Sequence, residues 1–230
     1  MNYKILFYIL CLLLLFPKVI VSDEIIIDSS KVKVLDEGNI ISALDVKAKI
    51  PGKKIEIEGD KSIYDKTSSQ LTIINNVKFF DNLKNVYIEA KKAIYNQITD
   101  VVQTFGETYI KVENKYDVYS YDLFYDRKSQ KIYSNKETTI KDNKKNVFNL
   151  EDNFIFDLNK EIISSDRTNI LDNYNNEYNF ENSKINLKNN EIAGKELNVN
   201  FIDSYFGNPS NQPVLKGKGS TSDELKTKIY

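Results

Sequence analysis

The chain has 230 residues, with 32 lysines and arginines against 33 aspartates and glutamates, so its formal net charge is −1. This balance leaves no basic face for nucleic acid, and the absence of histidine excludes imidazole chemistry. The length suits one large domain or two small ones.

The first element is an apolar N-terminal stretch, MNYKILFYILCLLLLFPKVIVS (1–22). Lys4 precedes an apolar run over 5–16, and the small Ser22 closes the stretch, which is the pattern of a secretory signal peptide. The alternative is a membrane anchor, but a spanning helix needs roughly 20 apolar residues, and Pro17 interrupts the run. We therefore expect an exported protein.

Alternating apolar and polar residues dominate the chain after this stretch. The run DEIIIDSSKVKVL (23–35) is β-prone, and strict alternation follows in KKIEIEG (53–59), NVKFF (76–80), NVYIEA (85–90) and YIKVE (109–113). Period-two alternation of β-branched and aromatic residues is typical of half-buried strands. No sustained helical stripe occurs in the exported part, so the sequence predicts strands throughout.

A motif recurs about every 30 residues. Its copies are IYDKTSSQL (63–71), IYNQITDVV (94–102), FYDRKSQKI (124–132), IFDLNKEII (155–163) and the looser KINLKNNEI (184–192). The Asp or Asn after the aromatic position favours a turn, because its side chain bonds the backbone two residues on. An aliphatic residue seven positions after the aromatic one begins the next strand, so each copy predicts a hairpin.

Two strands and two turns per unit cannot bury an apolar face alone, so the units must stack. A parallel β-helix competes with this interpretation, but 8 glycines in the whole chain are few for its corners. The predicted fold class is all-β: a folded-over antiparallel β-jelly roll with two sheets and units of about 30 residues. The predicted domains are the signal peptide (1–22), the jelly roll (23–203) and a linker (204–230).

Catalytic chemistry finds little support in the exported part. The only cysteine, Cys11, lies in the predicted signal peptide. The exported part therefore contains no cysteine and can have neither thiol chemistry nor disulfides. Turn formation explains Asp65, Asp126 and Asp157, and Glu56 and Glu58 are interpreted as a solvated outer face. We expect no enzyme activity, no catalytic residue, no cofactor and no metal site.

The repeated motif resembles the OstA-like, LptA-type family of periplasmic β-jelly-roll proteins of lipopolysaccharide transport. The resemblance covers about 24–203, with Gly59, Ala90 and Ser120 at the small-residue position before each motif, whereas Glu151 departs from it. The tail SYFGNPSNQPVLKGKGSTSDELKTKIY (204–230) is similar to the segment that leaves the N-terminal domain of LptD, the outer-membrane lipopolysaccharide-assembly member. The resemblance leaves two possibilities open: an N-terminal part of a barrel protein, or a free-standing LptA-like bridge protein.

The resemblance implies a protein that is periplasmic or associated with the outer membrane. It also implies transport of lipopolysaccharide, whose acyl chains would lie in a groove between the two sheets. Apolar members of the alternating runs are the candidates for this lipid groove: Ile57, Val77, Phe79, Ile88, Ile110 and Val112. The implied partners are lipopolysaccharide, outer-membrane assembly components, and another OstA-like jelly roll that adds a strand to the N-terminal edge. Ile25, Ile26 and Ile27 are the candidates for that edge.

Two other functions remain open at this stage. One is a periplasmic or surface structural β-repeat protein whose core is filled with its own side chains. The other is a glycan-active enzyme that uses a carboxylate pair, which the turn positions of the aspartates disfavour.

Overall fold

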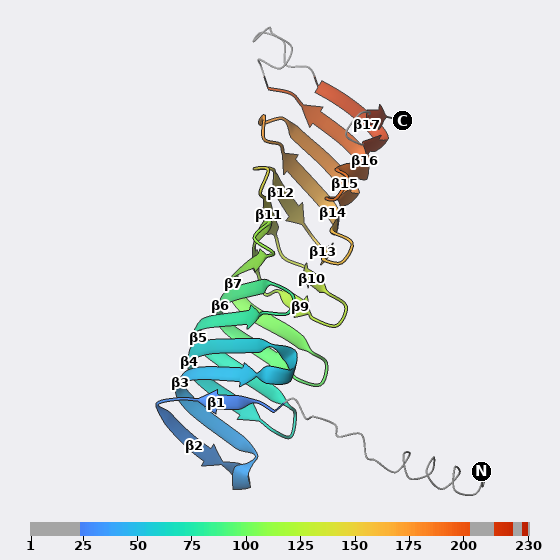
Figure 1. Ribbon diagram of the computed structural model, residues 1–230. Coiled ribbons are helices and arrows are strands. Elements are labelled where there is room, and N and C mark those ends of the chain that lie inside the picture. The colour runs from blue at the N-terminus through green and yellow to red at the C-terminus, as the bar shows by residue number, and fades with distance from the viewer. Residues whose placement is uncertain (1–23, 203–213, 223–226, 230) are drawn as a thin grey trace, which may run out of the picture.

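A computed structural model describes residues 24–202, 214–222 and 227–229, which form an elongated stack of strands (Figure 1). The predicted signal peptide lies outside the described residues. In the first half of the chain the strands are β1 (Ile26–Asp28), β2 (Lys31–Leu35), β3 (Ile40–Ile50), β4 (Ile55–Asp65), β5 (Gln70–Asp81), β6 (Val86–Asn96), β7 (Val101–Val112), β8 (Tyr116–Tyr121) and β9 (Phe124–Asp126). In the second half they are β10 (Lys131–Ser134), β11 (Thr138–Asp142), β12 (Val147–Glu151), β13 (Phe154–Asp157), β14 (Ile162–Leu171), β15 (Glu177–Asn186), β16 (Glu191–Asn200), β17 (Val214–Ser222) and β18 (Thr227–Ile229).

Helix is nearly absent from these residues. The described helical elements are two single 3-10 turns, η1 (Asp36–Gly38) and η2 (Pro51–Lys53). Within the same residues, no helix has the length and apolar character that crossing a membrane requires.

Each long strand is interrupted near its middle. β4 pairs with β5 over 55–58 with 78–81 and over 61–65 with 70–74, and the register shifts between the two stretches. The pairings of β5 with β6, β6 with β7 and β15 with β16 shift in the same way. We call the layer that contains 55–58 sheet I, the layer that contains 61–65 sheet II, and the line of interruptions the bend.

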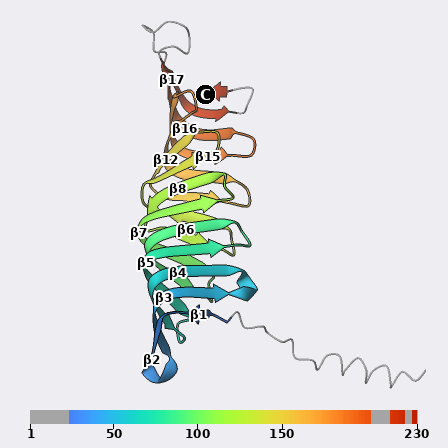
Figure 2. The same cartoon turned by 60° about the vertical axis from the view of Figure 1, so that its left-hand side comes forward.

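The meander folds over at the bend. A flat strand of 11 residues is about 36 Å long, so a flat sheet would hold its two rows of turns that far apart. Instead, Lys53, in a turn at the sheet I end, lies 3.4 Å from Asp100, in a turn at the sheet II end. Figure 2 views the folded sheet from the side, with hairpin turns gathered along one flank. The predicted all-β, folded-over antiparallel jelly roll is confirmed.

The repeated motif forms the turns of sheet II. Asp65 Oδ1 accepts hydrogen bonds from the backbone amides of Thr67 (2.8 Å) and Ser68 (3.3 Å), as the turn assignment predicts. The last residue of every such turn has a left-handed backbone that directs the chain into the next strand: Ser69, Asp100, Gln130, Glu161 and Asn190.

Small side chains line the interior along the bend, where the two sheets meet. A Cβ atom on Gly59 would lie 2.3 Å from Cγ2 of Ile73, so a side chain there has no room. Serine and threonine hydroxyls bond backbone groups that the interrupted ladder leaves unpaired; Ser165 Oγ, for example, donates to the carbonyl of Glu151 at 3.0 Å. The bend is therefore a narrow, hydrogen-bonded corner.

One predicted boundary is wrong. Residues 214–222, which the sequence assigned to a linker, form β17 and pair with β16 over eight positions. KGKGST (216–221) is weak as a strand signal, because it alternates lysine with glycine and contains no aromatic and only one β-branched residue. Residues 203–213 lie outside the described part.

Candidate binding site in the interior and along its flank

The interior of the jelly roll carries an unbroken apolar row on sheet I. Directly paired residues on successive strands form it: Ile27, Ala48, Ile57, Phe79, Ile88, Ile110, Val118, Ile140, Phe148, Ile170, Tyr178, Val199 and Leu215. Four of the six predicted groove residues belong to this row, and Val77 and Val112 lie on either side of it. All six point into the interior and are at most 4% exposed.

A matching row crosses sheet II, and the repeated motif is its sequence signature. Its members are Val34, Ile41, Tyr64, Leu71, Tyr95, Val102, Tyr125, Ile132, Phe156, Ile163, Ile185 and Ile192. In the first four copies the aromatic residue pairs across its hairpin with the aliphatic residue seven positions later, and in the fifth copy Ile185 takes the place of the aromatic residue. The groove prediction omitted this second wall, although the motif itself held the signal.

The expected groove is filled rather than open in this structure. Along the middle of the stack the residues of both rows are almost fully buried, with Ile88, Tyr125 and Phe156 at 0% exposure, whereas Val34 and Leu215 at the ends of the rows are exposed. Large rings occupy the wide side of the interior, where Tyr116 and Phe156 meet edge to face at 5.3 Å between ring centroids. Any ligand between the sheets would have to displace these side chains.

The N-terminal end of the interior is hollow. Ile25, Ile27, Val32, Ile41 and Tyr64 contribute to the lining of a cavity of about 540 Å³. Of the three predicted edge residues, Ile26 is 54% exposed, while Ile25 and Ile27 are half-buried against the core. β1 forms a ladder with β3 through Ile27 and Ala48, and no ladder to a further described strand covers its outer side.

A buried ion cluster closes the flank opposite the bend. Arg127, which is 6% exposed, donates from Nε to Asp81 at 2.6 Å and from Nη1 to both carboxylate oxygens of Asp100 at 2.8 Å. Its Nη2 donates to the carbonyl of Lys53 at 3.1 Å, and Lys53 Nζ donates to the hydroxyl of Tyr95 at 3.1 Å. Two cations and two carboxylates thus connect turns of sheet I with turns of sheet II.

The cluster is chemically saturated rather than reactive. Burial opposes ionisation of Asp100, but hydrogen bonds from Tyr95 and Arg127 and the charges of Arg127 and Lys53 outweigh it, so the pKa of Asp100 lies below its ordinary value. Burial, with the adjacent carboxylate of Asp81, raises the pKa of Tyr125, whose hydroxyl donates to Asp81 at 3.0 Å. These charges stabilise one another and hold the two sheets together.

Further polar bridges follow the cluster along the same flank. Tyr116 donates its hydroxyl to Glu161 at 2.8 Å, and Lys115 Nζ lies 3.7 Å from the same carboxylate. Farther on, Lys144 Nζ donates to Asn190 at 3.2 Å. Sequence analysis missed all of these contacts, because each joins residues about 46 positions apart.

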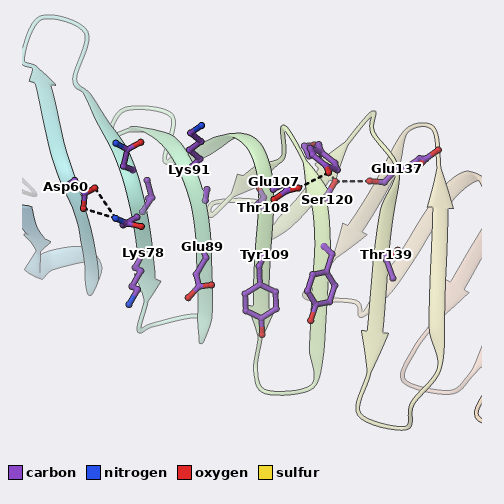
Figure 3. A pocket seen from close by; sticks show the side chains of 16 residues that line it. Asp60, Lys78, Glu89, Lys91, Glu107, Thr108, Tyr109, Ser120, Glu137 and Thr139 are labelled. Atoms are coloured by element: carbon purple, nitrogen blue, oxygen red, sulfur yellow. Dashed lines mark hydrogen bonds between the residues drawn. The ribbon is translucent and has the colours of Figure 1, made fainter.

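The outer face of sheet I holds a shallow trough of about 980 Å³, drawn in Figure 3. The rings of Tyr109 and Tyr119 contact each other there in a tilted arrangement, with 5.2 Å between ring centroids, and the exposed side chains of Glu89 and Lys78 line the same trough. On the neighbouring strand Glu56 pairs with Lys49, as a solvated face would. The described residues contain no cluster of three or more potential metal ligands.

No protein-family description matches the chain, and no curated protein is similar to it.

Proposed function

We propose that the chain is an exported carrier of lipopolysaccharide that belongs with the OstA-like, LptA-type jelly rolls. It binds acyl chains between its two sheets and assists their transfer toward the outer membrane, without chemistry on the lipid. Its partners are lipopolysaccharide, a neighbouring jelly roll and outer-membrane assembly components.

The unbroken pair of apolar rows is the observation that supports this proposal. The sheet I row runs from β1 to β17 and the sheet II row from β2 to β16, so an acyl chain moving along them meets the same kind of surface over most of the sheet. Apolar contact stabilises a chain by about 25 cal/mol per Å² without a directional bond. Binding of this kind leaves low barriers between neighbouring positions.

Site-specific photo-crosslinking tests the proposal. Ile88 is buried in the sheet I row, and the next residue, Glu89, is exposed. A photoreactive residue at position 88 is expected to capture lipopolysaccharide in cells, and one at position 89 is not. Equal capture at the two positions would contradict an interior path, and native mass spectrometry of the purified protein reports whether it carries lipid at all.

The filled interior supports a second function, a structural β-repeat protein. In that case the buried side chains are a permanent core, and the sheets never separate. Absence of lipid both from the purified protein and from crosslinks at position 88 would favour this alternative.

A further inference from the structure

The bridges along the flank recur with the period of the repeat. Lys53, Lys84, Lys115 and Lys144 occupy successive turns of sheet I, about 30 residues apart. The last position of each successive turn of sheet II has a left-handed backbone and the same spacing; it is occupied by Asp100, Gln130, Glu161 and Asn190. Each lysine faces the residue 46 or 47 positions later. We call these four facing pairs the seam.

Three of the four pairs are bridged. Lys53 lies 3.4 Å from Asp100, Lys115 lies 3.7 Å from Glu161, and Lys144 donates to Asn190 at 3.2 Å. The second pair, Lys84 and Gln130, has no bridge among the described residues. A cavity of about 130 Å³ separates the two turns at that point.

Aliphatic side chains and one lysine line this gap together with polar groups. Leu158 occupies the turn position that Arg127 holds one repeat earlier, so an aliphatic side chain replaces the ion cluster. Val112, in the wall of the interior, lies at the bottom of the cavity and is 4% exposed. Glu113, the carboxylate of the rim, is already paired with Lys115 at 2.9 Å. Lys84 is therefore the cation left for a ligand.

We propose that the gap between Lys84 and Gln130 is a side opening through which one acyl chain of an anionic amphiphile enters the interior. The headgroup binds Lys84, and the chain passes Leu158 and Val112 toward the apolar rows as the two turns move apart. The bridged pairs on either side keep the rest of the flank closed. This inference rests on the proposed function and adds the place and the charge of the ligand.

A variant that bridges the second pair of the seam tests whether the gap is a side opening. Gln130→Glu places a carboxylate opposite Lys84, as in the third pair, with almost no change in shape. The probe is a fatty acid with a photoreactive diazirine, and the readout is the labelled peptide and its rate of labelling. Since a partly exposed ion pair alters an equilibrium by up to about fivefold, labelling around Leu158 is expected to slow about two- to fivefold.

The matched variant is Glu161→Gln, which removes the carboxylate from the third pair and is expected to create a second labelled position beside Lys115. A third variant, Lys84→Gln, is expected to reduce labelling by the fatty acid but not by the corresponding fatty alcohol. Unchanged labelling in Gln130→Glu, or wild-type labelling confined to the N-terminal hollow, would overturn the side opening while leaving the carrier function standing. A wild-type protein that takes up no probe contradicts both.

Discussion

At the scale of single residues, two arginines form a natural comparison. Arg127 and Arg167 each pair with two carboxylates, but the Arg127 side chain is 4% exposed and the Arg167 side chain 59%. Removing one partner from a buried ion pair costs about 3–5 kcal/mol, whereas an exposed pair contributes about 0–1 kcal/mol. We expect Arg127→Met to lower the free energy of unfolding by several times more than Arg167→Met.

Urea unfolding followed by circular dichroism measures this difference. If both variants lost the same small free energy of unfolding, the ion pairs of Arg127 would not be what holds the two sheets together. Asp81→Asn provides a second measurement, because it removes the partner of Nε.

Acid sensitivity follows from Asp100. Its pKa is held below the ordinary value of 3.8, since the hydrogen bonds and cations around it outweigh the opposing effect of burial. A carboxyl with a depressed folded pKa contributes stability that is complete above its unfolded pKa and is lost as pH falls through the folded pKa. We therefore expect wild-type stability to fall more steeply than that of Asp100→Asn below about pH 4. The measurement is the urea midpoint of each protein from pH 6 to pH 2. If both midpoints fell by the same amount over this range, Asp100 would not be the source of the acid sensitivity.

At the scale of elements, the bend depends on close packing at Gly59. An added Cβ would lie 2.3 Å from Ile73, while one at Gly219 meets nothing within 4 Å. Overpacking a filled interior costs about 1–3 kcal/mol, so Gly59→Ala is expected to destabilise the protein by that amount. Gly219→Ala is the control and is expected to be neutral. Equal urea midpoints for the two variants would mean that the corner at Gly59 relaxes freely.

The sequence predicted the strands and turns well, for identifiable reasons. Alternation in IEIEG and VYIEA is local, and the Asp or Asn of each motif acts within three residues, so both signals are readable in a short window. The bend is harder to predict, because the register shifts there, with an extra residue within 75–77 of β5 and within 106–107 of β7, leave the alternation on either side intact. Cross-flank contacts such as Arg127 with Asp81 join residues 46 positions apart. No local sequence pattern encodes these cross-flank contacts. The regular spacing of the four seam lysines becomes meaningful only once the two rows of turns are known to face each other.

At the scale of the whole molecule, the two ends of the stack differ. β1 and β2 close the N-terminal end around a hollow with Ile25, Ile27 and Val32 in its lining. At the other end, the sheet I half of β17, residues 214–217, pairs with β16. A strand edge at each end, one on either side of a continuous interior, permits head-to-tail addition of similar jelly rolls, which is a heterologous contact.

The last prediction concerns the N-terminal edge at Ile27. Proline removes one amide donor from β1, whereas Ile27→Val keeps the backbone and most of the apolar contact with the core. If a second jelly roll adds its last strand to this edge, Ile27→Pro weakens assembly and Ile27→Val leaves it nearly unchanged. Sedimentation velocity over a range of concentrations, with a second copy of the chain as the partner, measures assembly, and the urea midpoint shows whether the fold survives. A folded proline variant that assembles like the wild type would place the docking edge elsewhere. A variant that unfolds would instead assign β1 to closing its own sheet against Ala48, where its backbone already pairs.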